Sequence, residues 1–244
     1  METKGVQVQE DGVVLENAGP TRFVTLTHFW ACKLFAVSAS LRRKVTNMGE
    51  VADYYSWVTE HFGDVRPVRY REELWSMMSR RLSPGTARGI EFGVAWGYGT
   101  SWWLRHITDE GLRWDGFDRF TGLPRSWRDL PLGHFDTDGK PPAIADNRVT
   151  WHVGDVEERL TDLNLDRDPS SQFVILFDLD VFEPSLAAWQ HICGNLRPGD
   201  LLYFDEAFDR DERHLLDHFV LPSGRFEYVG STPLALALAV QEIY

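Results

Sequence analysis

Two acidic pairs in the second half of this 244-residue chain each follow a run of apolar residues. One pair is Asp178 and Asp180, and the other is Asp205 and Glu206. A single helical segment separates the two apolar runs, so we expect the pairs to lie at adjacent strand ends. Grouped carboxylate oxygens suit a hard cation such as Mg²⁺. We therefore predict all four as metal ligands and Asp178 and Asp180 as catalytic residues. The alternative is that one acid caps a helix while the others face solvent.

A glycine-rich turn carries the second piece of chemistry. It follows an apolar segment that ends in an acid, and a helix-like run follows it. A dinucleotide fingerprint, G-x-G-x-x-G, would need glycine where Trp102 stands, and an indole there would prevent close helix–strand packing. A nicotinamide dehydrogenase is therefore the least favoured enzyme. The spacing G-x-x-x-G-x-G behind an acid suits a cofactor with a cationic amine and no pyrophosphate, and indicates S-adenosylmethionine. The predicted cofactor residues of the turn are Glu91, Gly93, Gly97, Gly99 and Thr100.

Three more acids are expected at the cofactor. Asp118 ends the next predicted strand, where a carboxylate can accept both ribose hydroxyls; otherwise it is a turn or cap residue. Asp155 follows the third strand and should lie near the adenine amino group. It equally fits the N-cap of a helix at 156–163, and one residue can do both. Asp178 is counted with the cofactor residues as well as with the metal ligands.

Strand and helix patterns alternate from residue 88 onward. An all-apolar strand, such as the fourth, is expected where both faces of a sheet are buried. The pattern predicts an α/β fold, a doubly wound, mostly parallel seven-stranded Rossmann-like methyltransferase sheet with an antiparallel terminal strand and an N-terminal helical extension. The expected strands are 89–92, 114–117, 149–153, 173–177, 201–204, 226–229 and 234–240.

The chain is predicted to have two parts. Residues 1–84 are an arm and helical extension that serves as a cap over the cofactor mouth or as a dimer contact. Residues 85–244 are the S-adenosylmethionine-binding domain. Within it, residues 119–148 are a long insertion rich in Pro and Gly, and such length indicates a functional lid. Apolar side chains in 21–48 suggest a homodimer surface.

Composition excludes several classes of partner. The formal net charge is −12, which argues against a nucleic-acid substrate and against binding to anionic membranes. No signal peptide and no apolar run of about 20 residues is seen. Two distant cysteines do not form a disulfide framework. These features predict a cytoplasmic enzyme that acts on a small molecule.

Three segments together resemble the macrocin O-methyltransferase family. They are Gly116–Pro124, Phe177–Ser185, and Arg197–Asp200 followed by Asp205 and Glu206. The resemblance covers roughly residues 85–240 and implies a class I, S-adenosylmethionine-dependent enzyme that needs Mg²⁺ and methylates sugar hydroxyls of natural products. It implies that the three glycines form the cofactor loop, that Asp118 holds the ribose, and that Asp178 or Asp180 binds metal with Asp205 and Glu206.

The chain departs from that family at two positions. Phe182 stands where the family usually has tyrosine, and Glu206 stands where it has a second aspartate. Both changes put the sugar specificity in doubt, because they alter groups expected near the acceptor.

A methyl-accepting hydroxyl needs a base to take its proton. Related catechol-type enzymes use a lysine after the fourth strand, but residues 141–244 contain none. Asp180 is the preferred base or a metal ligand beside Asp178. His134 in the long loop and His214 after the last acidic pair are the other candidates.

Two other functions stay open. The acceptor could be a catechol or phenol stacked on tryptophans, which would give the pocket a flat aromatic rim instead of a charged one. Alternatively, the chain could be a catalytically silent, methyltransferase-like binding protein. Tight cofactor binding without turnover would identify the latter.

Overall fold

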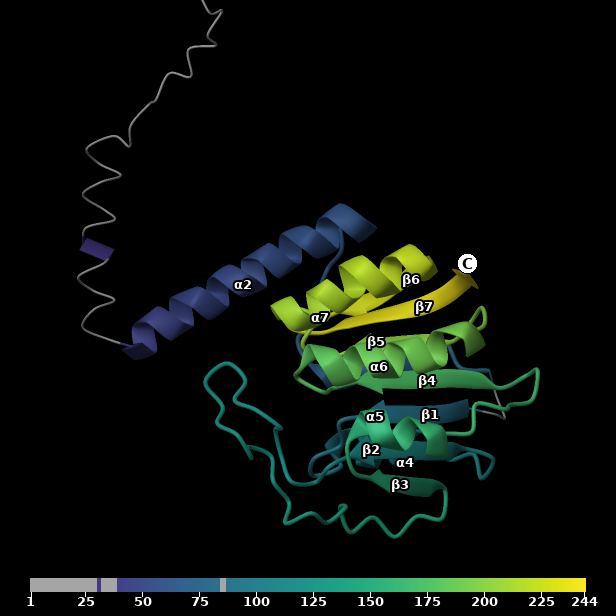
Figure 1. Cartoon of the computed structure of the whole chain (residues 1–244). Helices are drawn as coiled ribbons and strands as arrows, with labels where there is room; N and C mark the ends of the chain where they lie inside the picture. Colours follow the sequence, from purple (N-terminus) through teal and green to yellow (C-terminus); the bar gives the residue numbers. More distant parts are fainter. Residues whose placement is uncertain (1–29, 32–38, 84–86) are drawn as a thin grey trace, which may run out of the picture. The chain divides into compact units, whose positions relative to one another are not determined.

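The computed structural model describes residues 30–31, 39–83 and 87–244 (Figure 1). By compactness the chain divides into Met1–Met48 and Gly49–Tyr244, and the second unit contains the whole sheet. The strands are β1 (Ala87–Phe92), β2 (Arg113–Asp118), β3 (Val149–Val153), β4 (Gln172–Phe177), β5 (Leu201–Phe204), β6 (Gly224–Ser231) and β7 (Leu236–Ile243).

One sheet contains all seven strands in the order β3-β2-β1-β4-β5-β7-β6. The first five strands run parallel to one another, and β7 runs antiparallel to both β5 and β6. The strand order reverses between β1 and β4, which is where open α/β sheets bind ligands. The prediction of a mostly parallel Rossmann-like sheet with an antiparallel strand near its end is confirmed.

Helices pack on both faces of the sheet. Successive residues of each central strand point to opposite faces, so Ile175 and Phe177 belong to one core cluster and Val174 and Leu176 to the other. This explains why β4 is apolar from Phe173 to Phe177. The helices are α2 (Ala39–Phe62), α3 (Arg71–Ser79), α4 (Tyr98–His106), α5 (Val156–Arg159), α6 (Phe182–Ile192) and α7 (Arg210–Leu215).

Residues 49–83 belong to the same compact unit as the sheet. Tyr54 and Val58 of α2 are buried in the core cluster that includes α5 and α6, as their helical spacing predicts. Leu74, Trp75 and Met78 of α3 are buried in the other cluster. The helical extension therefore has a fixed place beside the sheet from Gly49 onward.

Two further predictions concern loops and termini. The insertion 119–148 has no helix or long strand, only isolated bridges that pair Thr121 with Asp136 and Trp127 with Leu130.

Most of the predicted dimer surface in 21–48 lies outside the described residues; Trp30 is described and is 61% exposed. Within the described part of the chain, no helix combines the length and the apolar character that crossing a membrane requires.

Candidate active site

One cavity of about 890 Å³ opens at the carboxyl ends of the strands. Its walls are the glycine turn after β1, the ends of β2, β4 and β5, the start of α5, part of the insertion, and α3. Ligand sites commonly measure about 300–1,000 Å³. The cavity is therefore large enough for two small molecules, and it lies at the position that the strand order predicts.

The glycine turn brings β1 and β4 unusually close together. Gly93 has a φ of 88°, and a Cβ placed there would lie 1.6 Å from the carbonyl oxygen of Asp178. The amide of Asp178 also donates to the carbonyl of Phe92 at 2.8 Å. Only glycine fits this conformation and this approach. The first glycine of the motif thus sets the position of Asp178 in the cavity.

Glu91 stabilises the glycine turn through hydrogen bonds. Its Oε2 accepts from the indole Nε1 of Trp114 at 2.9 Å and from the hydroxyl of Thr100. A Cβ on Gly99, the second residue of α4, would lie 2.4 Å from Oε1, so this position favours glycine as well. Burial raises the pKa of Glu91 to about 7, although the hydrogen bonds from Thr100 and Trp114 lower it. The side chain borders the cavity and at the same time holds α4 to the sheet.

Asp118 holds the glycine turn through its own carboxylate. Oδ2 accepts from the amides of Val94 (2.8 Å) and Ala95 (2.7 Å), and Oδ1 accepts from the amide of Phe120 (2.6 Å). A carboxylate has about four acceptor positions. One position on Oδ1 is left for a donor in the cavity, so the predicted ribose role is compatible with these bonds but limited to one further hydrogen bond.

Asp155 does not act as a side-chain cap. It stands at the N-cap position of α5, but its carboxylate makes no capping hydrogen bond. Instead Oδ1 lies 2.8 Å from Nε of Arg119, on the rim of the cavity. Asp155 therefore stands at the N-cap position without capping the helix through its side chain, and its contact with the adenine amino group stays a prediction.

Three carboxylates meet at the ends of β4 and β5. Asp178, Asp205 and Glu206 each offer an oxygen within 4.8 Å of the others, and we refer to them as the acid triad. Asp205 is 4% exposed and accepts from the hydroxyl of Tyr203. Burial and the charge of Asp205 raise the pKa of Asp178 and of Glu206 well above the ordinary values. The triad is therefore held together at an electrostatic cost that a cation would relieve.

Asp180 stands beside the triad in a strained conformation. Its φ is 62°, a left-handed value that few residues other than glycine adopt. Burial, followed by the charges of Asp205 and Asp209, raises the pKa of Asp180 to about 7. The sequence predicted four metal ligands. Three of them form the acid triad, and the fourth, Asp180, lies outside it with a pKa of about 7.

Two residues that interact with the triad were not predicted from the sequence as site residues. Glu212 of α7 is 4% exposed, and neither of its carboxylate oxygens has a hydrogen-bond partner among the described residues. The sequence Asp209–Glu212 resembles an N-cap with an acid three residues on, but only the Asp209 carboxylate caps the helix, by accepting from the amide of Asp211 at 3.0 Å. Burial and the charges of Asp205 and Asp178 raise the pKa of Glu212.

Arg71 is the second such residue. It is the first residue of α3, and its guanidinium lies 3.1 Å from Oδ2 of Asp205 and 4.0 Å from Oδ2 of Asp178. No local signal distinguishes Arg71 from neighbouring arginines such as Arg69. Its role depends on where α3 packs on the sheet.

Three predicted residues do not line the cavity. Gly97 is the N-cap of α4 with a φ of 75°, and Thr100 donates its hydroxyl to Glu91. His134 packs its ring against Phe135, 4.4 Å between centroids. Gly97 and Thr100 therefore support the loop without lining the cavity, and His134 contacts Phe135, one of the insertion residues that do line it.

His214 and Phe182 are also outside the cavity wall. Their rings pack on each other, 4.9 Å between centroids, and His214 also stacks near His218 at 4.2 Å. The tyrosine-to-phenylalanine difference from the resembled family therefore falls in the packing between α6 and α7.

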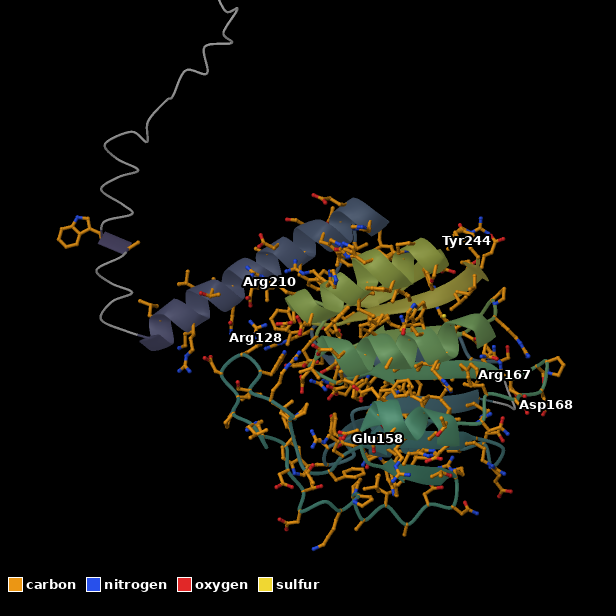
Figure 2. All side chains as sticks on the ribbon, in the orientation of Figure 1. Arg128, Glu158, Arg167, Asp168, Arg210 and Tyr244 are labelled. Carbon is orange, nitrogen blue, oxygen red and sulfur yellow. The ribbon has the colours of Figure 1, made fainter. Side chains whose placement is uncertain are left out.

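The insertion is tied to the body of the protein by two arginines. Arg128, labelled in Figure 2, lies 2.8 Å from Oδ2 of Asp209 and also contacts Glu50 of α2. Arg125 forms a bidentate pair with Glu183 of α6, at 3.0 and 2.7 Å. These bonds hold the segment that carries Leu123, Trp127 and other cavity residues over the strand ends.

No protein-family model and no curated protein matches the chain. Among solved structures, it is similar to that of CalS11, a calicheamicin methyltransferase, with a TM-score of 0.51 and 20% identity over 96% of this chain and 99% of that chain. It is also similar to that of the O-methyltransferase NovP, with a TM-score of 0.53 and 14% identity over 70% and 80%. At these identities the likeness establishes a shared fold, that of known methyltransferases.

Proposed function

We propose that the protein is an S-adenosylmethionine-dependent O-methyltransferase that acts on a hydroxyl of a small molecule, a sugar or glycosylated natural product, with the help of Mg²⁺. The observation that carries the proposal is that one cavity contains both the glycine turn with Asp118 and the acid triad. A methyl donor and an acceptor need such adjacent sites. The activities named for CalS11 and NovP agree with it.

The donor end of the cavity has the groups that an adenosyl cofactor requires. Gly93 and Gly99 of the turn line the cavity, Asp118 keeps one acceptor position for a ribose hydroxyl, and Asp155 lies on the rim for the adenine amino group. S-adenosylmethionine would supply the methyl group from its sulfonium. In this role Glu91 acts through Thr100 and Trp114, which fix the turn.

The residues of the triad fit a divalent cation. Glu206 has a buried Oε2 without a hydrogen-bond partner among the described residues, and the three carboxylates converge within 4.8 Å. Oxygen-only donor sets favour Mg²⁺. When bound, Mg²⁺ would orient the acceptor and lower the pKa of its hydroxyl.

Asp180 is the proposed base. It lines the cavity beside the triad, and its pKa of about 7 suits a group that takes a proton near neutral pH. The acceptor hydroxyl would give its proton to the Asp180 carboxylate as its oxygen bonds to the methyl carbon, and the bond between that carbon and the sulfonium sulfur would break, with S-adenosylhomocysteine as the leaving group. The left-handed backbone at Asp180 is strain of the kind that functional sites retain.

The cavity walls suit a small acceptor. Residues 49–83 supply Arg71 and Trp75 as the proposed cap, and the insertion supplies a wall on the other side as the proposed lid. We do not expect nucleic acid or membrane as partner, given the net charge of −12. A cytoplasmic location and a homodimer remain predictions.

A phenolic acceptor is the second candidate. Trp96 is 63% exposed and lies on the cavity wall, where its ring meets Phe135 edge-on at 5.6 Å. An exposed aromatic pair offers a stacking surface for a flat ring. Arg125 and Glu183 on the same wall are the charged groups expected for a sugar, so the wall supports both acceptor classes.

The test combines donor binding with turnover. S-adenosylhomocysteine should bind the wild type and Asp205→Asn with affinities within about threefold, whereas Asp205→Asn and excess chelator should each reduce methyl transfer at least about a hundredfold. Glu242→Gln, at an exposed carboxylate outside the cavity wall, is the control and should keep wild-type activity. The panel contains sugar and phenol hydroxyls, which separates the two acceptor classes.

Four outcomes would contradict the proposal or one of its parts. Full activity in chelator would exclude a catalytic role for Mg²⁺. Absence of donor binding would exclude methyltransferase activity. Tight donor binding without turnover on any hydroxyl would identify a silent binding protein. Retained activity in Asp180→Asn, where a loss of about 10²–10⁴-fold is expected of a missing base, would exclude Asp180 from that role.

A further inference from the structure

The acid triad already holds a cation from the chain itself. The guanidinium of Arg71 lies 3.1 Å from one oxygen of Asp205 and 4.0 Å from one oxygen of Asp178. Burial by itself would lower the pKa of Arg71, but the charge of Asp205, followed by those of Tyr203 and Asp178, raises it above the ordinary value. One positive charge thus faces three carboxylates whose oxygens lie within 4.8 Å of each other.

The position of Arg71 in α3 indicates that the acid triad holds the Arg71 side chain in place. It is the first residue of the helix, where the helix dipole disfavours a positive charge. The helix cannot follow the side chain, because Leu74, Trp75 and Met78 anchor it in the core. The side chain of Arg71, in contrast, is 39% exposed. It can therefore leave the triad by rotating while α3 stays in place.

Asp205 cannot bind Arg71 and a metal ion through the same carboxylate oxygen at the same time. Oδ1 already accepts from the hydroxyl of Tyr203, and Oδ2 faces the guanidinium. A divalent ion binds a carboxylate oxygen at about 2.0–2.1 Å. An ion on Oδ2 would stand against the guanidinium within a few ångströms, and two cations at that distance repel each other.

We propose that Arg71 is the resident counter-ion of the acid triad, and that a divalent cation binds the triad by displacing the Arg71 side chain. The inference rests on the metal centre of the proposed function. It adds a property that the metal centre alone does not require: metal affinity is set by competition with a side chain of the helical extension. Loading of the triad thereby moves one residue on the wall of the acceptor cavity.

Calorimetric titration of the metal-free, full-length protein with Mn²⁺ and Mg²⁺ tests the competition. Arg71→Met keeps the apolar stem and removes the charge, and it should bind Mn²⁺ about tenfold tighter than the wild type. Arg71→Lys keeps a charge without the planar fork, and should tighten binding about threefold. Arg125→Met is the matched control, since Arg125 lies on the same wall but pairs with Glu183; its affinity should match the wild type.

Asp205→Asn separates the two hypotheses. If it abolishes Mn²⁺ binding while Arg71→Met binds no tighter than the wild type, the metal centre stands and the displacement by metal is refuted. If the wild type and both Arg71 variants bind neither ion, the triad is not a metal site and both proposals fail. If Arg71→Met does not fold, a wild-type-like affinity of Arg71→Lys refutes the displacement. An equal gain in Arg125→Met would also refute it, because the effect would then be general charge removal.

Discussion

Replacing Glu91 by Gln should stabilise the protein above neutral pH and change it little in acid. Burial raises the pKa of Glu91 from its ordinary 4.5 to about 7, the hydrogen bonds from Thr100 and Trp114 being too weak to offset it. Between these two values the folded protein carries one more proton than the unfolded chain. The stability that this proton provides is complete below about pH 4.5 and is lost as the pH rises through about 7.

The size of the effect follows from the pKa. One bound proton makes the free energy of unfolding fall by about 1.4 kcal/mol per pH unit between the two values. The whole interval amounts to roughly 3 kcal/mol, which for a chain of this length is about 6–12 °C in Tm. A Gln side chain cannot ionise, and its carbonyl oxygen can accept the bonds from Thr100 and Trp114 that Oε2 now accepts.

Thermal unfolding followed by circular dichroism at pH 5 and pH 8 checks this expectation. The difference in Tm between Glu91→Gln and wild type should grow between the two pH values, whereas Glu157→Gln, at an exposed carboxylate of the cavity rim, should change stability by less than about 0.5 kcal/mol at both. A difference independent of pH would refute the reasoning. A large loss of S-adenosylhomocysteine affinity instead would make Glu91 a direct cofactor ligand.

Two further substitutions test the turn and the insertion. Gly93→Ala should destabilise the protein by several kcal/mol and abolish donor binding, because its Cβ would meet the carbonyl of Asp178 at 1.6 Å; normal thermal unfolding would contradict the fitted turn. Arg128→Ala removes bonds to Asp209 and Glu50, each worth about 1.5–3 kcal/mol. Limited proteolysis within 119–148 should therefore be at least about tenfold faster. An unchanged rate would show that the insertion is held by other contacts.

The fold could be predicted from the sequence almost completely. Apolar runs bounded by glycines and acids locate the strands, since burial on both faces of a sheet leaves a continuous local signal; the strands 149–153 and 201–204 match the prediction to the residue. The last helix is different: the pattern from Asp209 onward predicts a helix to about Phe219, but α7 ends at Leu215 and a π-helical turn follows. Helix ends depend on packing that no local pattern contains.

The acids at the strand ends were also predictable. Parallel strands bring their carboxyl ends to one edge, so the position of a residue at the end of a strand is enough to predict which other residues lie near it. This places Asp118, Asp178, Asp205 and Glu206 in one cavity, as the structure has them. The chemistry expected of Asp180 follows from its position in the same way, although its left-handed backbone does not.

The sequence by itself thus determined the sheet, the glycine turn and the acids at the strand ends, because each depends on contacts made within or just after one element. The tertiary structure alone decided what balances those acids. Arg71 reaches the triad from α3, and no local pattern marks it as a partner of these acids. Electrostatic partners act across space and not along the chain, so only the packing of distant helices on the sheet could bring them to the site.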